Sequence, residues 1–183
     1  MEHIIREYKE QDRDRLKRKA TMNKTLNEFE KTIGEISKLK NVENDRLLDP
    51  IQEGKWSIRE IVGHLYYWDK HNLESMVAKM TDGANLPPFP DHDQQNEEAI
   101  AYLNGESVNA IINSFIAMRK ELIESISKVE DNTRFTIGKG KRKFSAESFI
   151  KIFVKHDVYH LQQINKKIGC LAEDNSMGKN YGK

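Results

Sequence analysis

Two histidines near the end of the chain have the spacing of residues that share a ligand. His156 and His160 are four positions apart in the segment FVKHDVYHLQQI, whose apolar residues recur with the period of a helix. Side chains at this spacing lie on one helix face, about 6 Å apart along the axis. Both histidines fall in line with an apolar stripe made of Phe149, Ile152, Phe153 and Ile164. We therefore expect both imidazoles to point into the protein, where they could bind the same metal ion.

A third histidine, His64, has a similar inward position. It lies among Ile61, Leu65 and Trp68 in the helical projection of its own segment. Three neutral imidazoles from two helices can occupy one face of a divalent metal ion and leave other positions open for water or substrate. A metal held in this way lowers the pKa of a bound water or thiol, so that hydroxide or thiolate forms near neutral pH. The predicted metal ligands are therefore His64, His156 and His160.

The sequence also allows interpretations without this metal site. A single inward histidine is commonly a hydrogen-bonded core residue. The segment HDVYH resembles the zincin motif HExxH, but Asp157 stands where that motif has a longer glutamate, which argues against a peptidase. Asp157 and His160 also have the spacing of a di-iron ligand pair. Such bundles need a second copy and further carboxylates, whereas this sequence has one copy.

The remaining histidines are expected outside the metal site. His71 follows His64 by seven positions, about 10 Å along a helix axis, so it could line the pocket without sharing the ion. His92, in a proline-rich crossover, and His3 are expected at the surface.

Polar residues close to the histidines could orient the imidazoles. They are Tyr67, Asp69, Asp157, Tyr159 and Gln163. A metal-bound imidazole usually donates its second ring proton to a carboxylate or carbonyl oxygen. Gln163 is three positions after His160 and is aligned with it. Asp157 lies about 100° around the helix from its neighbour and is expected to face solvent or another helix.

Four amphipathic segments are expected to position these residues. They are residues 22–36, 57–80, 107–129 and 145–168. The second begins with a capping box, in which Ser57 is followed three positions later by Glu60. The fourth is expected to end at Gly169, because glycine favours the position after a helix. Four such helices predict an all-α four-helix bundle.

The connections suggest one long crossover and one small hairpin. Residues 81–106 hold three of the four prolines and a short predicted helix at 93–103. Residues 133–144 alternate loosely around two glycines and are compatible with a small β-hairpin before the last helix. The predicted organisation is a charged arm or surface helix (1–20), one bundle domain (21–170) and a polar tail (171–183).

Two segments resemble the DinB/YfiT-like metalloenzyme family. They are KWSIREIVGHLYYWD at 55–69 and KHDVYHLQQI at 155–164. The family pattern has a tryptophan-serine helix start with a histidine one to two turns inside it, and two further histidines four apart in the last helix. These histidines correspond to His64, His156 and His160. The resemblance extends over residues 22–170 and includes the polar crossover.

The resemblance implies a DinB/YfiT-like four-helix bundle, commonly dimeric, with zinc or nickel on the three histidines. Activities of the family include thiol S-transfer with bacillithiol or mycothiol, thiol-dependent isomerisation and hydrolysis. The chain is therefore expected to be a divalent-metal-dependent thiol transferase or hydrolase. Its expected partners are a small-molecule substrate, a low-molecular-weight thiol and a second copy of the chain. The alternative is a non-catalytic stress-response or binding module with a structural metal or none. Tyr159 stands where a common form of the family has another histidine, so a phenol replaces an imidazole there.

Composition argues against several other functions. The 183 residues include 30 Lys and Arg and 29 Asp and Glu, a net charge of +1, which gives no overall field to hold nucleic acid or an anionic membrane. The basic loop GKGKRK lacks the strand and helix context of a phosphate-binding loop. A single cysteine, Cys170, cannot form an intrachain disulfide. With no signal-peptide pattern and no apolar run of about 18 residues, a cytoplasmic protein is expected.

Overall fold

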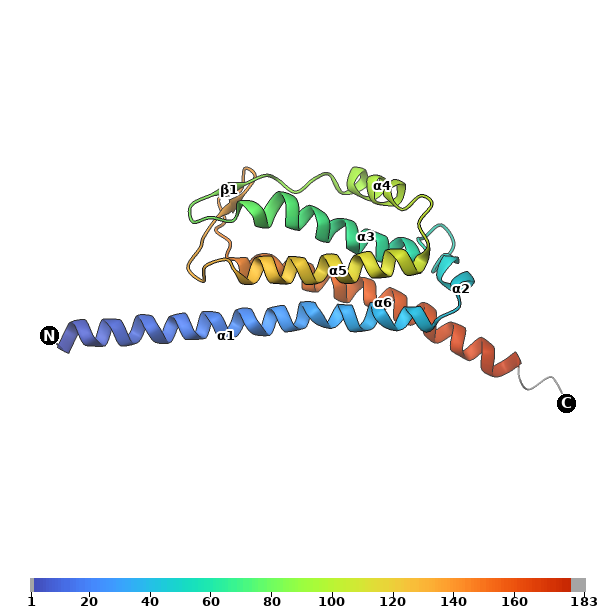
Figure 1. The fold of residues 1–183 in the computed structure, drawn as a ribbon, viewed down its shortest axis with the longest axis horizontal. Coiled ribbons are helices and arrows are strands. Elements are labelled where there is room, and N and C mark those ends of the chain that lie inside the picture. Colours follow the sequence, from blue (N-terminus) through green and yellow to red (C-terminus); the bar gives the residue numbers. More distant parts are fainter. Residues whose placement is uncertain (1, 179–183) are drawn as a thin grey trace.

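The computed structural model describes residues 2–178, with side chains described for residue 6 and residues 9–169. Within this part of the chain, four long helices lie side by side as a bundle, with two shorter helices beside them (Figure 1). The α-helices are α1 (Glu2–Lys38), α2 (Asn44–Leu48), α3 (Ile58–His71), α4 (His92–Tyr102), α5 (Val108–Ser127) and α6 (Ala146–Gly178). The predicted all-α four-helix bundle is confirmed.

Helix packing places α3 and α6 on either side of a shared interior. α1 packs against α5 and α6, and α3 packs against α5 on its inner side and α4 on its outer side. In Figure 1, α4 and the long connection around it lie on the side of α3 that is away from α1. The side of α3 that faces α4 is therefore covered by the crossover.

The apolar stripes of these helices form two clusters. One cluster includes Phe29, Trp68, Leu122, Phe149 and Phe153, and the other includes Ile36, Ile61, Leu65, Phe115 and Ile164. A fully buried side chain of this size contributes about 1.5–3 kcal/mol by leaving water, so the two clusters account for much of the driving force for folding.

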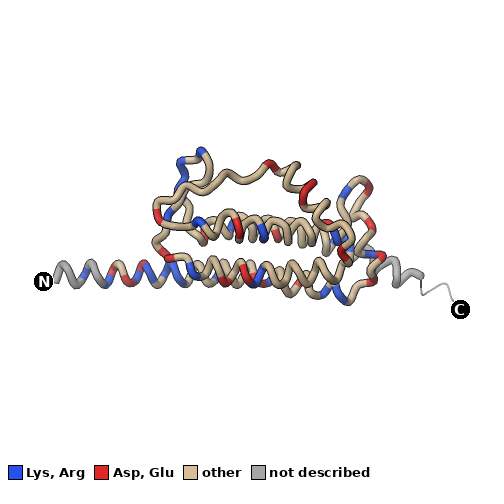
Figure 2. The backbone as a smooth tube through the Cα atoms, turned by 45° about the horizontal axis from the view of Figure 1, so that its top comes forward, with Lys and Arg blue, Asp and Glu red and all other residues tan. Residues whose placement is uncertain are grey.

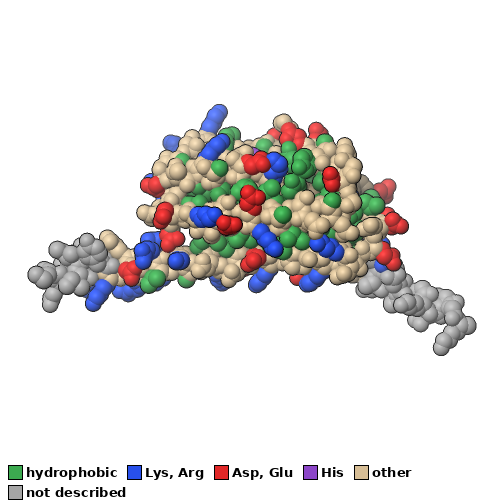
Figure 3. Space-filling model, in the orientation of Figure 1, with side chains coloured by type: hydrophobic (Ala, Val, Ile, Leu, Met, Phe, Trp, Pro, Cys, Tyr) green, Lys and Arg blue, Asp and Glu red, His purple; other side chains and the backbone are tan. Residues whose placement is uncertain are grey.

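Most charged residues of the described part of the chain lie on the outer faces of the helices. Lysine and arginine are interspersed with aspartate and glutamate along the described part of the chain (Figure 2). Charges of both signs are interspersed on the face shown in Figure 3. None of the helices among the described residues combines the length and apolar character required to cross a bilayer.

The start of α3 is fixed by the predicted capping box. The Ser57 backbone N–H donates to Glu60 Oε2 at 2.7 Å, and the Glu60 N–H donates to Ser57 Oγ at 3.2 Å. The helix does not continue unchanged to residue 80. It passes into a π-helical turn, η2 (Asn72–Met76), and then a 3₁₀ turn, η3 (Val77–Lys79). A π turn inserts one residue into an α-helix, and helical spacing alone does not reveal such an insertion.

The expected hairpin is reduced to one antiparallel bridge between Phe135 and Phe144. The strand in this segment, β2 (Thr136–Ile137), instead pairs in parallel with β1 (Asn85–Leu86) of the crossover. This pairing joins segments that are about 50 residues apart. Because it depends on where the crossover lies over the bundle, local alternation could not predict it.

Both ends of the bundle differ from the predicted boundaries. α1 runs without a break across residue 20, and α6 passes Gly169 and extends to Gly178. A Cβ at Gly169 would meet no atom within 4 Å, so no neighbouring segment blocks the continuation of the helix at this position. The division into arm, bundle and tail stays a prediction. The side chains of His3 and Cys170 lie outside the described residues.

Gly63 allows the crossover to approach α3 closely. A Cβ built at this buried position would lie 2.1 Å from Leu103 Cδ1 and 2.8 Å from Leu103 Cγ. We expect Gly63→Ala to lower the free energy of unfolding by about 1–3 kcal/mol, because the side chain of Leu103 must move within a packed core. Gly34, in the exposed part of α1, has no atom within 4 Å of such a Cβ. Gly34→Ala is therefore the matched control and should raise stability by about 0.5–1 kcal/mol. If urea unfolding showed that both substitutions change the free energy of unfolding in the same direction, this interpretation would be contradicted.

Candidate metal centre

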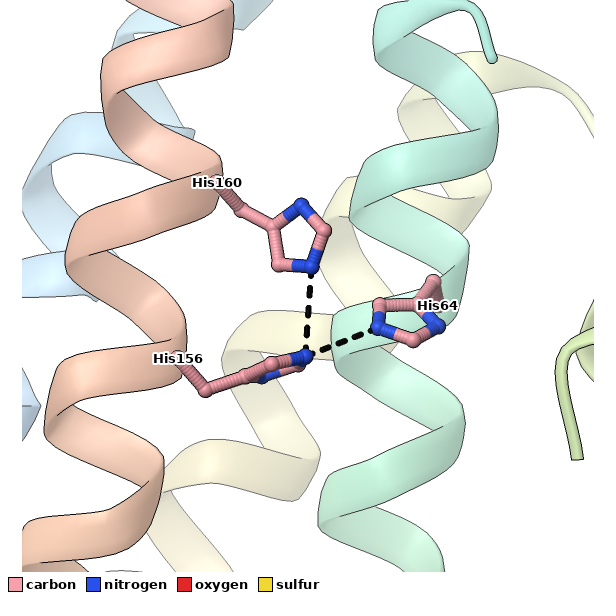
Figure 4. A group of neighbouring side chains, drawn as sticks. All are labelled: His64, His156 and His160. Atoms are coloured by element: carbon pink, nitrogen blue, oxygen red, sulfur yellow. Dashed lines mark hydrogen bonds between the residues drawn. The ribbon is translucent and has the colours of Figure 1, made fainter. Parts of the chain in front are cut away.

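The three predicted histidines meet between α3 and α6. His64 projects from α3, and His156 and His160 project from successive turns of α6 (Figure 4). The Nε2 atom of His156 lies 2.9 Å from Nε2 of His64 and 3.2 Å from Nε2 of His160. The potential ligand atoms of the three residues all lie within 4.8 Å of one another. Among the described residues, this is the one group of three or more such side chains with the geometry to hold a metal ion.

This arrangement fits a divalent metal ion. Nitrogen ligands at 2.0–2.1 Å from a tetrahedral zinc ion are about 3.3 Å apart. The two Nε2 separations are therefore only slightly shorter than a metal site requires, and small rotations of the rings would bring all three nitrogens to one ion. Trp56 and Trp68 cover His64 on two sides, with ring centres 4.9 Å and 6.3 Å from it.

The second ring nitrogens of the histidines help to set their tautomers. His160 Nδ1 lies 2.9 Å from Gln163 Oε1, which can only accept a hydrogen bond. A neutral His160 therefore carries its proton on Nδ1 and presents the lone pair of Nε2 to the other histidines. This confirms the alignment of Gln163 with His160 expected from their spacing. His64 Nδ1, by contrast, makes no hydrogen bond of full geometry, and its polar neighbour is the side chain of Asn96, which acts to raise the pKa of His64 against the effect of burial.

Burial keeps these imidazoles neutral. It lowers the pKa of His64 to about 2, and the neighbouring His156 and His160 add to that effect. Burial, together with His160, also lowers the pKa of His156 to about 4. The pKa of His160 is lowered as well, chiefly by burial. Since a metal binds the neutral form, the cluster is ready to coordinate at neutral pH without losing protons.

Comparison with known proteins agrees with this geometry. Residues 25–164, which contain all three histidines, match the family model of the DinB superfamily. The chain belongs to the DinB superfamily. A comparison with curated protein sequences finds no significant match.

The bundle of this DinB-superfamily chain is similar to a solved structure. That structure is YfiT from Bacillus subtilis, described as a probable metal-dependent hydrolase with an unusual four-helix bundle topology. The two chains are 15% identical, and the match covers 82% of this chain and 87% of YfiT with a TM-score of 0.65. At this identity the comparison establishes the fold.

A buried charge cluster lies close to the histidines in the DinB bundle. Arg119 on α5 donates from Nε to Asp69 Oδ2 at 2.6 Å and from Nη2 to Asp157 Oδ1 at 3.2 Å. It also donates to the Phe29 carbonyl oxygen, and Thr32 Oγ1 donates to Asp157 Oδ2 at 2.8 Å. Asp69 is on α3, Asp157 on α6, and Phe29 and Thr32 are on α1. The cluster therefore connects all four long helices.

Sequence reasoning missed the central member of this cluster. Arg119 follows Phe115 by four positions and precedes Leu122 by three, so its place on the apolar stripe of α5 was the available signal. Asp157 does face neighbouring helices, which was one of the two expected orientations. Asp69 was a candidate partner for an imidazole, but its hydrogen bonds go to Arg119.

The other candidate residues lie around the cluster rather than in it. His71 and His92 both contact Trp68, with ring centres 6.0 Å and 5.6 Å away. His71 lines a pocket on the outer side of α3, and His92 is exposed as expected. Tyr159 is 58% exposed, and its hydroxyl accepts a hydrogen bond from Gln163 Nε2. Its ring contacts the imidazole of His160 edge-on, with ring centres 5.2 Å apart, and its hydroxyl is connected to His160 Nδ1 through Gln163.

The lowered histidine pKa values predict a pH-dependent stability. An unfolded histidine has a pKa of about 6.5, so between pH 4 and 6.5 the unfolded chain binds protons that folded His64 and His156 do not. The free energy of unfolding of the metal-free protein should therefore fall as the pH falls below 6.5, by up to about 1.4 kcal/mol per pH unit for each histidine.

Urea unfolding at pH 7.5, 6.0 and 5.0 would measure this change. His64→Gln should reduce the slope of stability against pH more than His92→Gln, because His92 is an exposed histidine and the smallest of the named causes that lower the pKa values of His64 and His156. Equal stability of the metal-free parent at pH 7.5 and 5.0 would contradict the explanation.

Proposed function

We propose that this protein is a divalent-metal-dependent enzyme of hydrolase or thiol S-transferase type, with the metal on His64, His156 and His160. The observation that carries the proposal is the meeting of three neutral imidazoles from α3 and α6, with their nitrogens within 4.8 Å of one another. Three protein ligands leave coordination positions open, as is typical of catalytic rather than structural zinc sites.

Zinc or nickel suits this donor set, because imidazole nitrogen is a common ligand of both ions. When bound, such an ion acts as a Lewis acid that lowers the pKa of a coordinated water or thiol. The residues of the chain would hold and shield that site. Gln163 keeps the proton of His160 on Nδ1, and the rings of Trp56 and Trp68 limit access of water to His64.

The substrate would be a small molecule, with a low-molecular-weight thiol as the second reactant if the reaction is a transfer. The description of YfiT as a probable metal-dependent hydrolase supports the hydrolytic alternative. The family resemblance supports thiol transfer and a homodimer, and the sequence pattern is the basis for a cytoplasmic location. These finer assignments are part of the proposal.

Two generic reactions would test the proposal. Zinc- or nickel-loaded protein should hydrolyse p-nitrophenyl acetate, or consume cysteine in the presence of 1-chloro-2,4-dinitrobenzene, faster than His156→Ala/His160→Ala. Gln162→Ala, an exposed change on the same helix, is the matched control. Equal rates for the parent and the double variant would contradict catalysis at this site. Stoichiometric metal without turnover of either probe would instead favour a binding module with a structural metal.

A further inference from the structure

The boundary between α3 and α4 contains an unusual set of buried polar atoms. Seven buried side-chain nitrogen and oxygen atoms among the described residues have no hydrogen-bond partner, and all belong to α3, to η2 or to α4. They are His64 Nδ1, Trp68 Nε1, His71 Nε2, Asn72 Nδ2 and Oδ1, Gln95 Nε2 and Asn96 Oδ1. The side chains of His64 and Asn96 are polar neighbours and can partner each other within the chain. A buried polar group without a partner costs about 1–3 kcal/mol, so the remaining atoms, on Trp68, His71 and Gln95 among others, call for a partner from outside the chain.

The atoms on α3 and α4 lie where the two helices pack together. His64, Trp68 and His71 are spaced by four and three positions on α3, and Gln95 and Asn96 lie on α4, which packs against it. We call these five residues the α3–α4 seam. The seam reaches the surface at a pocket that His71 and Gln95 both line.

Trp68 links the seam to the histidine cluster. Its ring centre is 6.3 Å from both His64 and His156 on one side and 6.0 Å from His71 on the other. It is buried, at 4% exposure, and its indole N–H has no acceptor. A molecule that accepted a hydrogen bond from Trp68 would therefore lie close to His64 and His156, two of the three histidines.

Two of the free atoms of the seam are obligate hydrogen-bond donors. Trp68 Nε1 and Gln95 Nε2 can only donate, which calls for an acceptor on the ligand. The charged groups of the pocket do not favour an anion. Lys70 is paired with Glu74 at 2.7 Å, and Glu98 leaves an excess of negative charge. Since burial lowers the pKa of His71, that residue adds no cation.

We propose that the α3–α4 seam is a subsite for an uncharged, carbonyl-bearing part of a small substrate, such as an amide, next to the three-histidine site. Its place in a reaction rests on the proposed function. Binding to the seam does not, because the seam atoms differ from the atoms that would hold the metal.

The two tryptophans of the chain allow the subsite to be tested by NMR. The probe is uncharged N-acetylglycine N-methylamide, added to ¹⁵N-labelled protein with and without zinc. We expect a saturable shift of the Trp68 indole N–H resonance in both samples, with a smaller shift for Trp56, which is assigned by Trp56→Phe. N-acetylglycine, an anion with the same acetamido group, should bind more weakly.

Neighbouring glutamines provide a matched pair of variants. Gln95→Met removes the unpartnered donor and should weaken binding of the probe about fivefold, the usual effect of one hydrogen bond. Gln94 is exposed and donates to Glu98, so Gln94→Met should leave the dissociation constant unchanged. The absence of a saturable Trp68 shift, tighter binding of the anion, or equal weakening by both variants would overturn the proposal and indicate that water alone fills the seam.

Zinc analysis of the same samples keeps the two proposals separate. A chain that binds the probe at Trp68 but retains no zinc would contradict the metal-dependent function and support the subsite. A chain that retains zinc but shows no Trp68 shift would contradict the subsite and leave the metal site supported.

Discussion

The double substitution His156→Ala/His160→Ala is expected to abolish the stabilisation of the protein by metal. A ligand that binds only the folded state raises the free energy of unfolding by about 4 kcal/mol when its free concentration is a thousand times its dissociation constant. The parent should show a rise of this order with zinc or nickel, because two of its three nitrogen donors come from these residues on α6. The double variant retains only His64 and should show no such rise.

The measurement is urea unfolding with and without metal, together with the metal content of dialysed protein. Gln162→Ala, on the exposed side of α6, controls for a general effect on the helix and should behave as the parent does. A parent that retains no zinc or nickel after both are supplied, or a double variant that retains as much as the parent, would refute the assignment of the ligands.

Replacing Arg119 with methionine is expected to have the largest effect on stability. The change leaves Asp69 and Asp157 facing each other at 1% and 2% exposure without their shared cation. Removing one partner of a buried ion pair typically lowers the free energy of unfolding by about 3–5 kcal/mol. The guanidinium also lies 3.6 Å from the ring centre of Phe29, an interaction that methionine would lose.

Lys128→Met is the matched control for Arg119→Met. Lys128, next to the C-terminal end of α5, pairs with Glu124 in solvent, where an ion pair contributes about 0–1 kcal/mol. Similar losses for the two variants would contradict a special role of the buried cluster. A triple variant with Arg119→Met, Asp69→Leu and Asp157→Leu should recover much of the lost stability, because it leaves no unpaired buried charge.

The Arg119→Met variant should also respond to pH in a characteristic way. Burial already raises the pKa of Asp69 to about 7, and Arg119 opposes that shift. Without Arg119 the pKa rises further, so the folded variant binds protons that the unfolded chain, with a carboxyl pKa near 4, does not. Its stability relative to the parent should therefore be lower at pH 8 than at pH 5. A constant difference between the two proteins would contradict this account.

The sequence alone predicted the structural features that depend on local interactions. The spacing of apolar residues predicted the four long helices, and the pair Ser57 and Glu60 predicted the start of α3, because both depend on contacts within one or two turns. The inward direction of His156 and His160 and the partnership of His160 with Gln163 follow from helical spacing in the same way.

Only the tertiary structure decided how these local elements meet. The contact of His64 with the pair on α6, the position of Arg119 between Asp69 and Asp157, and the pairing of β1 with β2 depend on the distances and rotations between elements. Those quantities are set by packing, such as the close approach of Leu103 to Gly63, and not by the period of any one helix. The sequence thus determined which histidines face inward and the order of the helices. The structure determined that the nitrogens of the three histidines lie within 4.8 Å of one another and that the α3–α4 seam adjoins them. Both features result from contacts between distant segments.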